Sequence, residues 1–196
     1  MNVGSPIDSV VPTLDGPVLE VLASSSVALS LTEIHRRASR GALSGVRSVL
    51  QRLVREGIVD AVPGGYLLNR EHVATGAIKA LVGLRSEFIS RLRDQVSSWS
   101  YDADLVGLFG SFARRDGDAE SDIDILIVGD DRLPDDLMDE LAGRVLAWTG
   151  NQAQIMTLTR TDLRRLQSAD EPILAEWHRD LEMVHGDVAL LAAVVA

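Results

Sequence analysis

The stretch that decides the fold is Gly107–Asp131, "GLFGSFARRDGDAESDIDILIVGDD". One apolar run, "DLVGLFG", ends in Gly110-Ser111, and the following "FARRDG" is typical of the first turns of a helix. A second apolar run, "DIDILIV", begins with two acids one residue apart. Short apolar runs bounded by turn residues are typical of buried strands, so we expect a strand, a tight Gly-Ser turn, a helix and a second strand.

The Gly-Ser turn and the two acids have complementary chemistry. A strand followed by Gly-Ser and a helix N-terminus presents backbone N–H groups to an anion. Alternation along a strand puts Asp122 and Asp124 on the same face, where two carboxylates repel each other unless a cation lies between them. Oxygen donors without a nearby His or Cys indicate Mg²⁺ or Mn²⁺. Together these features predict transfer of a phosphoryl or nucleotidyl group.

The two halves of this stretch match a family signature. Gly110-Ser111-Phe112-Ala113-Arg114 and Ser121-Asp122-Ile123-Asp124, followed by "ILIV", resemble the GSxAR…SDxDLxV motif of minimal nucleotidyltransferases of the DNA polymerase β-like superfamily. The resemblance covers Asp104–Gly186. It implies a mixed-sheet α/β domain that binds ATP or another NTP with Mg²⁺ or Mn²⁺. It assigns catalysis and metal binding to Asp122 and Asp124, and nucleotide binding to Gly110, Ser111, Arg114 and Ser121.

The third carboxylate of the family is missing from its expected place. The family supplies this acid, a metal ligand and general base, from a later strand. Here a helix over Leu133–Trp148 precedes that strand, "NQAQIMTL", and Gln154 stands where the acid is expected. An amide cannot take a proton from an attacking hydroxyl, so the site could bind Mg-NTP yet transfer slowly or not at all. Asp118 or Glu120 could contribute instead, and the sequence favours neither.

Charge is distributed unevenly along the chain. The net charge is −10, but residues 31–70 carry seven Arg against three acids, whereas residues 101–196 carry eight Arg against twenty acids. A basic segment ahead of an acidic one indicates two modules with different partners.

Residues 1–70 resemble the winged helix-turn-helix domains of bacterial transcription regulators. We expect helices over Pro17–Ala23, Leu31–Ser39 and Leu43–Glu56, then two short strands, "IVDAV" and "YLLN". In such domains the second helix of the pair enters the major groove. The resemblance implies DNA binding, although winged helices also serve dimerisation or protein docking, and the arginines could be a solvated face. The candidate DNA-binding residues are Arg36, Arg37, Arg40, Ser44, Arg47, Ser48, Gln51 and Arg52.

A third segment connects the two modules. Apolar residues at three- and four-residue steps predict one long amphipathic helix over Arg70–Trp99. It could join the modules, pack against a second copy in a homodimer, or face the core of the second domain, which is the simplest interpretation. The expected fold class is α+β, with a winged helix-turn-helix at 1–70, a connecting helix at 71–100 and a mixed-sheet nucleotidyltransferase domain at 101–196.

Two functions remain open. The first is an Mg-dependent enzyme that transfers NMP from an NTP to a hydroxyl acceptor, for example on a partner protein, as antitoxins of this family do with a toxin, and that binds DNA. The second is a DNA-binding transcriptional regulator whose nucleotidyltransferase-like domain senses nucleotide without chemistry. With no cysteine, no signal sequence and no apolar run of spanning length, we expect a cytoplasmic protein without a membrane partner.

Overall fold

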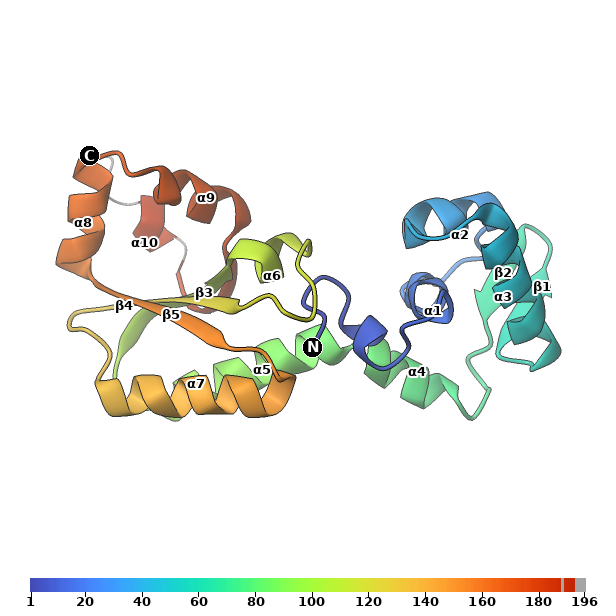
Figure 1. The fold of residues 1–196 in the computed structure, drawn as a ribbon, viewed down its shortest axis with the longest axis horizontal. Helices are drawn as coiled ribbons and strands as arrows, with labels where there is room; N and C mark the ends of the chain where they lie inside the picture. The colour runs from blue at the N-terminus through green and yellow to red at the C-terminus, as the bar shows by residue number, and fades with distance from the viewer. Residues whose placement is uncertain (188, 193–196) are drawn as a thin grey trace. The chain divides into compact units, whose positions relative to one another are not determined.

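The chain folds into two compact units. The computed structural model describes residues 1–187 and 189–192. One unit comprises Ser5–Arg85, and the other comprises Met1–Gly4 together with Ser86–Ala196 (Figure 1). The chain therefore passes between the units twice, after Gly4 and after Arg85, which the sequence patterns did not indicate. Among the described residues, no helix is both long enough and apolar enough to cross a membrane.

In the Ser5–Arg85 unit, a set of helices is followed by a two-stranded hairpin. After the short 3-10 helix η1 (Pro6–Ser9) come α1 (Asp15–Ala23), α2 (Leu31–Ala38), α3 (Leu43–Arg55) and the antiparallel strands β1 (Val59–Val62) and β2 (Gly65–Leu68). α2 begins at Leu31 because the Ser30 side chain accepts a hydrogen bond from the Glu33 amide at 3.2 Å. The predicted helices and strands of this part are confirmed to within two residues.

The core of this unit is formed by one side of each helix. Leu22 of α1, Ile34 of α2, and Val46 and Leu50 of α3 are at most 1% exposed and belong to one cluster of buried side chains. The three-helix part is thus held together by apolar burial, and the polar sides of α2 and α3 are left exposed.

The single helix expected over Arg70–Trp99 is wrong. The structure has α4 (Thr75–Val82) and α5 (Leu84–Ser97), with residues 70–74 outside any helix. Asn69 organises the non-helical part: its Nδ2 donates to the Gly57 carbonyl at 2.9 Å, and its own carbonyl accepts from the Thr75 hydroxyl at 2.6 Å. Such local hydrogen bonds compete with helix formation. Gly83, which has a low helix propensity, separates α4 from α5.

The second unit is built on a mixed four-stranded sheet, as predicted. Its strands are β3 (Ala103–Phe109), β4 (Ile123–Gly129), β5 (Ala153–Thr159) and β6 (Glu182–Gly186), in the order β5-β4-β3-β6. β3 pairs antiparallel with both β4 and β6, whereas β4 and β5 are parallel.

Helices cover both faces of this sheet (Figure 1). α5 and α7 (Asp135–Thr149), with the single-turn α6 (Gly110–Arg114), pack on one face; α8 (Arg160–Ser168), α9 (Pro172–Asp180) and α10 (Ala189–Ala192) pack on the other. In β4, Ile123, Ile125 and Ile127 face the α5–α7 side, and Leu126 and Val128 face the α8–α9 side. By the same alternation Asp124 points to the α8–α9 side, at the start of the strand.

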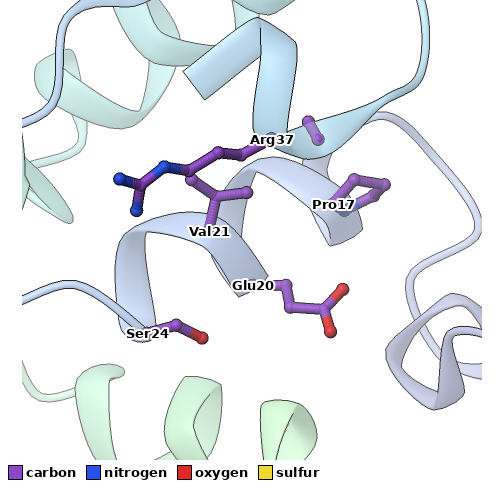
Figure 2. A pocket seen from close by; sticks show the side chains of 6 residues that line it. Pro17, Glu20, Val21, Ser24 and Arg37 are labelled. Carbon is purple, nitrogen blue, oxygen red and sulfur yellow. The ribbon is translucent and has the colours of Figure 1, made fainter. Parts of the chain in front are cut away.

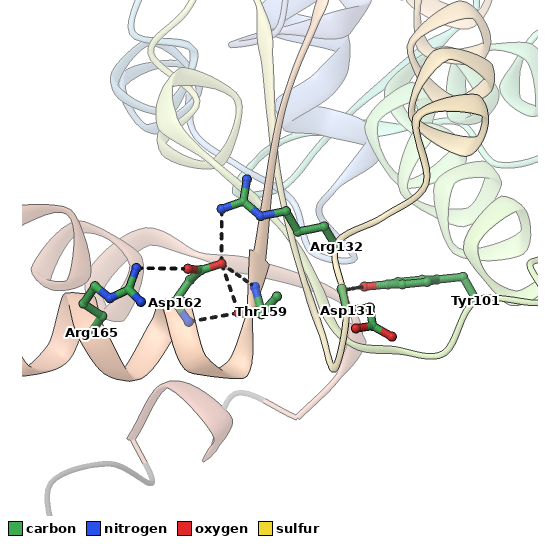
Figure 3. A network of polar contacts seen from close by, with 6 residues as sticks. All are labelled: Tyr101, Asp131, Arg132, Thr159, Asp162 and Arg165. Atoms are coloured by element: carbon green, nitrogen blue, oxygen red, sulfur yellow. Dashed lines mark hydrogen bonds and ion pairs between the residues drawn. The ribbon is translucent and has the colours of Figure 1, made fainter.

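A polar network holds the opposite end of β4. Asp162 forms a capping box with Thr159 at the start of α8 and also pairs with Arg132 and Arg165 (Figure 3). Hydrogen bonds from Thr159, helped by Arg132, lower the pKa of the Asp162 carboxyl. Tyr101 donates to the Asp131 carbonyl at 2.5 Å. The loop that follows β4 is therefore fixed by residues remote from the candidate site.

Candidate active site

The turn after β3 lies directly against the first acid of β4. Phe109 and Asp124 are paired in the antiparallel register, so Gly110 begins its turn beside Asp124. Gly110 has φ +64°, in the left-handed region, and a Cβ built on it would collide with Oδ2 of Asp124. Only glycine lets the backbone approach the carboxylate this closely without strain. The structure thus brings Gly110 and the Asp124 carboxylate together.

Asp122 and Asp124 are close to each other and lack a protein partner. Asp124 is half-buried, and Asp122 is exposed just before β4 begins. Burial raises the pKa of the Asp124 carboxyl, the negative charge of Asp122 raises it further, and Arg114 partly opposes both effects. Within the part of the chain that the structure describes, neither carboxylate makes a hydrogen bond or an ion pair. By contrast, Asp104 and Asp180 are each paired with an arginine.

Gln154 lies beside this pair. In the parallel ladder between β4 and β5 the register partner of Asp124 is Gln154, so their side chains point to the same face of the sheet. Gln154 is exposed. The structure thus places an amide next to Asp124 on the neighbouring strand, where the resemblance expects the third acid.

The two carboxylates suit a hard divalent cation. They offer oxygen donors only, the charge of Asp122 raises the cost of ionising Asp124, and among the described residues no cation is hydrogen-bonded to either. Residues 1–187 and 189–192 contain no group of three or more His, Asp or Glu side chains that could hold a metal ion. The strand register adds the Gln154 amide oxygen beside these two carboxylates.

The loop at residues 115–121, here called the active-site loop, separates the Gly-Ser turn from Asp122. Asp118 folds it: its Oδ1 accepts hydrogen bonds from the amides of Glu120 and Ser121 and from the Ser121 hydroxyl, all at 2.9–3.0 Å. These bonds lower the pKa of the Asp118 carboxyl. Asp118 is therefore occupied with the fold of the loop, whereas Glu120 is exposed and points its own carboxylate at no described partner.

Asn151 fixes the end of the same loop, and sequence reasoning missed it. Its Nδ2 donates to the carbonyls of Ala119 at 3.1 Å and Ser121 at 2.9 Å, and it is only 3% exposed. Ile123 donates to the Gln152 carbonyl just beyond. Asn151 is about thirty positions from its partners, so no local pattern in the sequence indicates this contact.

Arg114 and Arg115 differ in their surroundings. Arg114 donates to Asp116 at 3.0 Å, and that hydrogen bond raises the pKa of its guanidinium. Glu176 and Asp180 of α9 add to the effect. Arg115 is exposed and has φ +61°, in the left-handed region. That conformation favours glycine over residues with a side chain.

These features coincide with a family match. Residues 89–176 match the family model of the nucleotidyltransferase domain. This range contains the Gly-Ser turn, the active-site loop, both aspartates and Gln154. No curated protein matches the chain.

Two solved structures resemble a little more than half of this chain. One is a toxin-antitoxin with AMP-PNP, at 18% identity and a TM-score of 0.41, covering 54% of this chain and 79% of the other. The second is a mutant of the toxin-antitoxin MntA-HpeT, at 19% identity and a TM-score of 0.37, covering 56% of this chain and 79% of the other.

The candidate DNA-binding residues lie outside residues 89–176. Arg36 and Arg37 are on α2, Arg40 is between α2 and α3, and the others are on α3. Ser44, Arg47, Ser48 and Gln51 are exposed along one side of α3, and Arg36 is exposed on α2. Other candidates are engaged within the unit: Arg37 pairs with Glu33, Arg40 with Asp8, and Arg52 with Asp15 and Glu56. The pairs with Glu33 and Glu56 are exposed enough to be weak and open to competition from phosphates, whereas Asp8 and Asp15 are largely buried.

A depression of about 270 Å³ lies between α1 and α2 (Figure 2). It is lined by Pro17, Glu20, Val21, Ser24, Arg37 and Ala38. The Arg37 guanidinium and the Glu20 carboxylate point in different directions, and Arg37 already pairs with Glu33. Its charged groups do not converge on one point, so we assign it no ligand.

Replacing Gly110 with alanine is expected to disable the candidate site. The left-handed conformation costs an alanine about 1–2 kcal/mol, and its methyl group would push against the Asp124 carboxylate. We expect at least roughly a tenfold rise in the Kd for a Mg-bound NTP analogue, measured by calorimetric titration. The control is Gly143→Ala in α7, where a methyl group meets open space. Equal Kd values for both variants would contradict this prediction.

Proposed function

We propose that this protein is a divalent-metal-dependent nucleotidyltransferase. A hydroxyl oxygen of the acceptor would form a bond to the α-phosphorus of an NTP, the bond between the α- and β-phosphates would break, and pyrophosphate would leave. The observation that carries the proposal is the Gly110 turn lying against the partnerless pair Asp122 and Asp124. The match of residues 89–176 to the nucleotidyltransferase domain supports it. These two carboxylates would hold Mg²⁺ or Mn²⁺, which would supply positive charge to stabilise the triphosphate.

The residues of the chain would divide the remaining tasks. The backbone N–H groups of Gly110 and Ser111, at the start of α6, would donate hydrogen bonds to the triphosphate. Ser121 would set the position of Asp122 through its bonds to Asp118. Arg114, exposed beside the acids, would offset phosphate charge or order the loop through Asp116. The acceptor hydroxyl would approach from the side of Gln154, which can orient it but cannot take its proton.

The direct test is transfer of α-phosphate-labelled NMP in the presence of Mg²⁺. Candidate acceptors are tested as pools of small molecules, RNA and cytoplasmic proteins, including proteins encoded next to this one. We expect label on one acceptor class and its loss with EDTA. Complete absence of labelling, together with no thermal stabilisation by Mg-NTP, would overturn the proposal.

The second candidate function is nucleotide sensing without chemistry, and Gln154 is the observation that favours it. A site with two carboxylates and an amide can bind Mg-NTP while lacking the base for transfer. For a sensor we expect no labelling of any acceptor pool. We also expect Mg-NTP still to raise the unfolding temperature, and this rise to require Asp122 and Asp124. This outcome separates a sensor from an enzyme.

For the N-terminal unit we propose DNA binding in the winged helix-turn-helix manner, with α3 in the major groove. Three helices followed by a hairpin are present in the required order, and the exposed side of α3 offers Ser44, Arg47, Ser48 and Gln51. An acidic chain can still bind DNA through such a local basic surface.

Replacing Arg47 with alanine tests this DNA-binding surface. Arg47 is exposed and makes no ion pair among the described residues. A contact between Arg47 and a DNA phosphate would therefore break no ion pair within the protein. We expect the slope of log K against log salt to become shallower by about 1, measured by fluorescence anisotropy with duplex DNA. Arg91→Ala in α5, which breaks only an exposed pair with Glu87, serves as the control. Binding that does not depend on salt in the wild type would remove the DNA role.

A further inference from the structure

The N-terminal segment Met1–Gly4 belongs to the unit that contains the candidate site. The whole of Ser5–Arg85 separates it in sequence from the rest of that unit. Val3 is completely buried, in the same cluster as Phe112 of α6 and Ile123 of β4. A buried apolar side chain of this kind ties its segment firmly to the core.

The N-terminal segment is hydrogen-bonded to the active-site loop along the backbone. The Val3 amide donates to the Asp118 carbonyl at 3.1 Å, and the Gly4 amide donates to the Gly117 carbonyl at 3.2 Å. A Cβ on Gly4 would lie 2.6 Å from that Gly117 oxygen and 3.0 Å from the Arg115 oxygen. The two backbones are therefore packed together without room for a side chain.

Gly117 lies between Val3 of the N-terminal segment and the hydroxyls of Ser111 and Ser121, two of the candidate nucleotide-binding residues. A Cβ built on Gly117 would collide with Cγ2 of Val3 and would lie 2.8 Å from the hydroxyls of both Ser111 and Ser121. Val3 thus supports the loop from one side at the same place where the two serines meet it. A shift of Val3 would be transmitted to both serines through a contact that has no free space.

The active-site loop has few other anchors. Its residues 115–116 and 118–120 are exposed. Besides the N-terminal segment it is held by the Asp118 turn, by Asn151, and by Asp116, whose amide donates to the Ser111 carbonyl and whose carboxylate accepts from Arg114. Exposed loops with few buried contacts open easily. Burial of Val3 supplies the apolar anchor that the loop itself lacks.

We propose that Val3 and Gly4 are positioning residues for the nucleotide site, acting through Gly117 on Ser111 and on the Ser121-Asp122 segment. The expected effect on nucleotide binding rests on the proposed function, whereas the packing of Val3 and Gly4 against the loop does not. The N-terminal segment holds the active-site loop in the conformation that would bind nucleotide. Docking of the segment and binding of the nucleotide would therefore strengthen each other. Loosening the segment should weaken nucleotide binding although it does not touch the nucleotide.

The test compares full-length wild type with Val3→Ala, the conservative Val3→Ile, and the control Val184→Ala. Val184 is a buried valine of the same core, on β6. The first readout is amide exchange at Glu120 and Ser121 without nucleotide. In Val3→Ala we expect these amides to exchange faster than those of β4, whereas Val184→Ala changes them no more than the rest of the unit. Uniform acceleration in both variants would overturn the proposal.

The second readout is the Kd for Mg²⁺ with a non-hydrolysable ATP analogue. We expect roughly a tenfold rise in Val3→Ala, a value within the usual range of coupling between sites, with wild-type affinity in Val184→Ala and in Val3→Ile. An unchanged Kd in Val3→Ala would also overturn the proposal. If the wild type itself does not bind the analogue, the proposed function fails, and the exchange readout alone decides the role of Val3.

Discussion

Replacing Gln154 with aspartate is expected to raise the rate of NMP transfer by about 10²–10⁴-fold, the usual contribution of a positioned general base. The register pairs Gln154 with Asp124 on the adjacent parallel strand, so the new carboxylate would join the existing pair on the same face. It could ligate the metal ion and accept the proton of the acceptor hydroxyl. The measurement is the initial rate of labelling at saturating Mg-NTP.

The matched control for this variant is Gln154→Asn. It shortens the side chain as aspartate does but keeps the amide, so it separates the loss of length from the gain of an acid. In the absence of metal the third carboxylate adds repulsion beside Asp124, and we expect Gln154→Asp to unfold at a lower temperature than Gln154→Asn. Equal transfer rates in the two variants, with nucleotide binding intact, would contradict the prediction and favour the sensor.

The double variant Asp122→Asn/Asp124→Asn is expected to lose Mg-dependent nucleotide stabilisation and at least roughly 10²-fold in transfer rate, because amides are weak ligands for Mg²⁺. Without nucleotide or metal, the same variant should be more stable than the wild type at pH 7. The reason is that burial and the neighbouring charge disfavour the ionised Asp124 in the folded state. Thermal unfolding with and without Mg-NTP measures both effects.

The pH dependence of the stability difference follows from the raised pKa of Asp124. A folded-state pKa above the ordinary 3.8 means that the folded protein binds this proton more tightly than the unfolded chain. The wild type therefore gains stability from Asp124 as the pH falls through the folded pKa toward 3.8, and this gain is absent from the variant. The advantage of the double variant at pH 7 should shrink over that window in denaturant titrations. A constant difference would contradict the assignment.

Sequence patterns were sufficient for the elements around the site because those patterns are local. The apolar runs before Gly110 and after Asp122 each code for a buried strand, and the Gly-Ser turn between strand and helix needs no distant partner. The place of Gln154 was likewise predictable from the motif, and the β4–β5 register puts it beside Asp124. The connecting helix was misjudged because periodicity from Val73 onward concealed the Asn69 turn and the break at Gly83.

The sequence by itself determined the β3–turn–β4 unit, its two acids and the helical elements of the N-terminal unit, since each depends on residues adjacent in the chain. Only the tertiary structure decided that Asn151 hydrogen-bonds to the end of the loop and that Val3 packs against the loop. These contacts join residues separated by thirty to more than a hundred positions. Their partners are chosen by how the sheet and its loops pack, and no local pattern of residues records that choice.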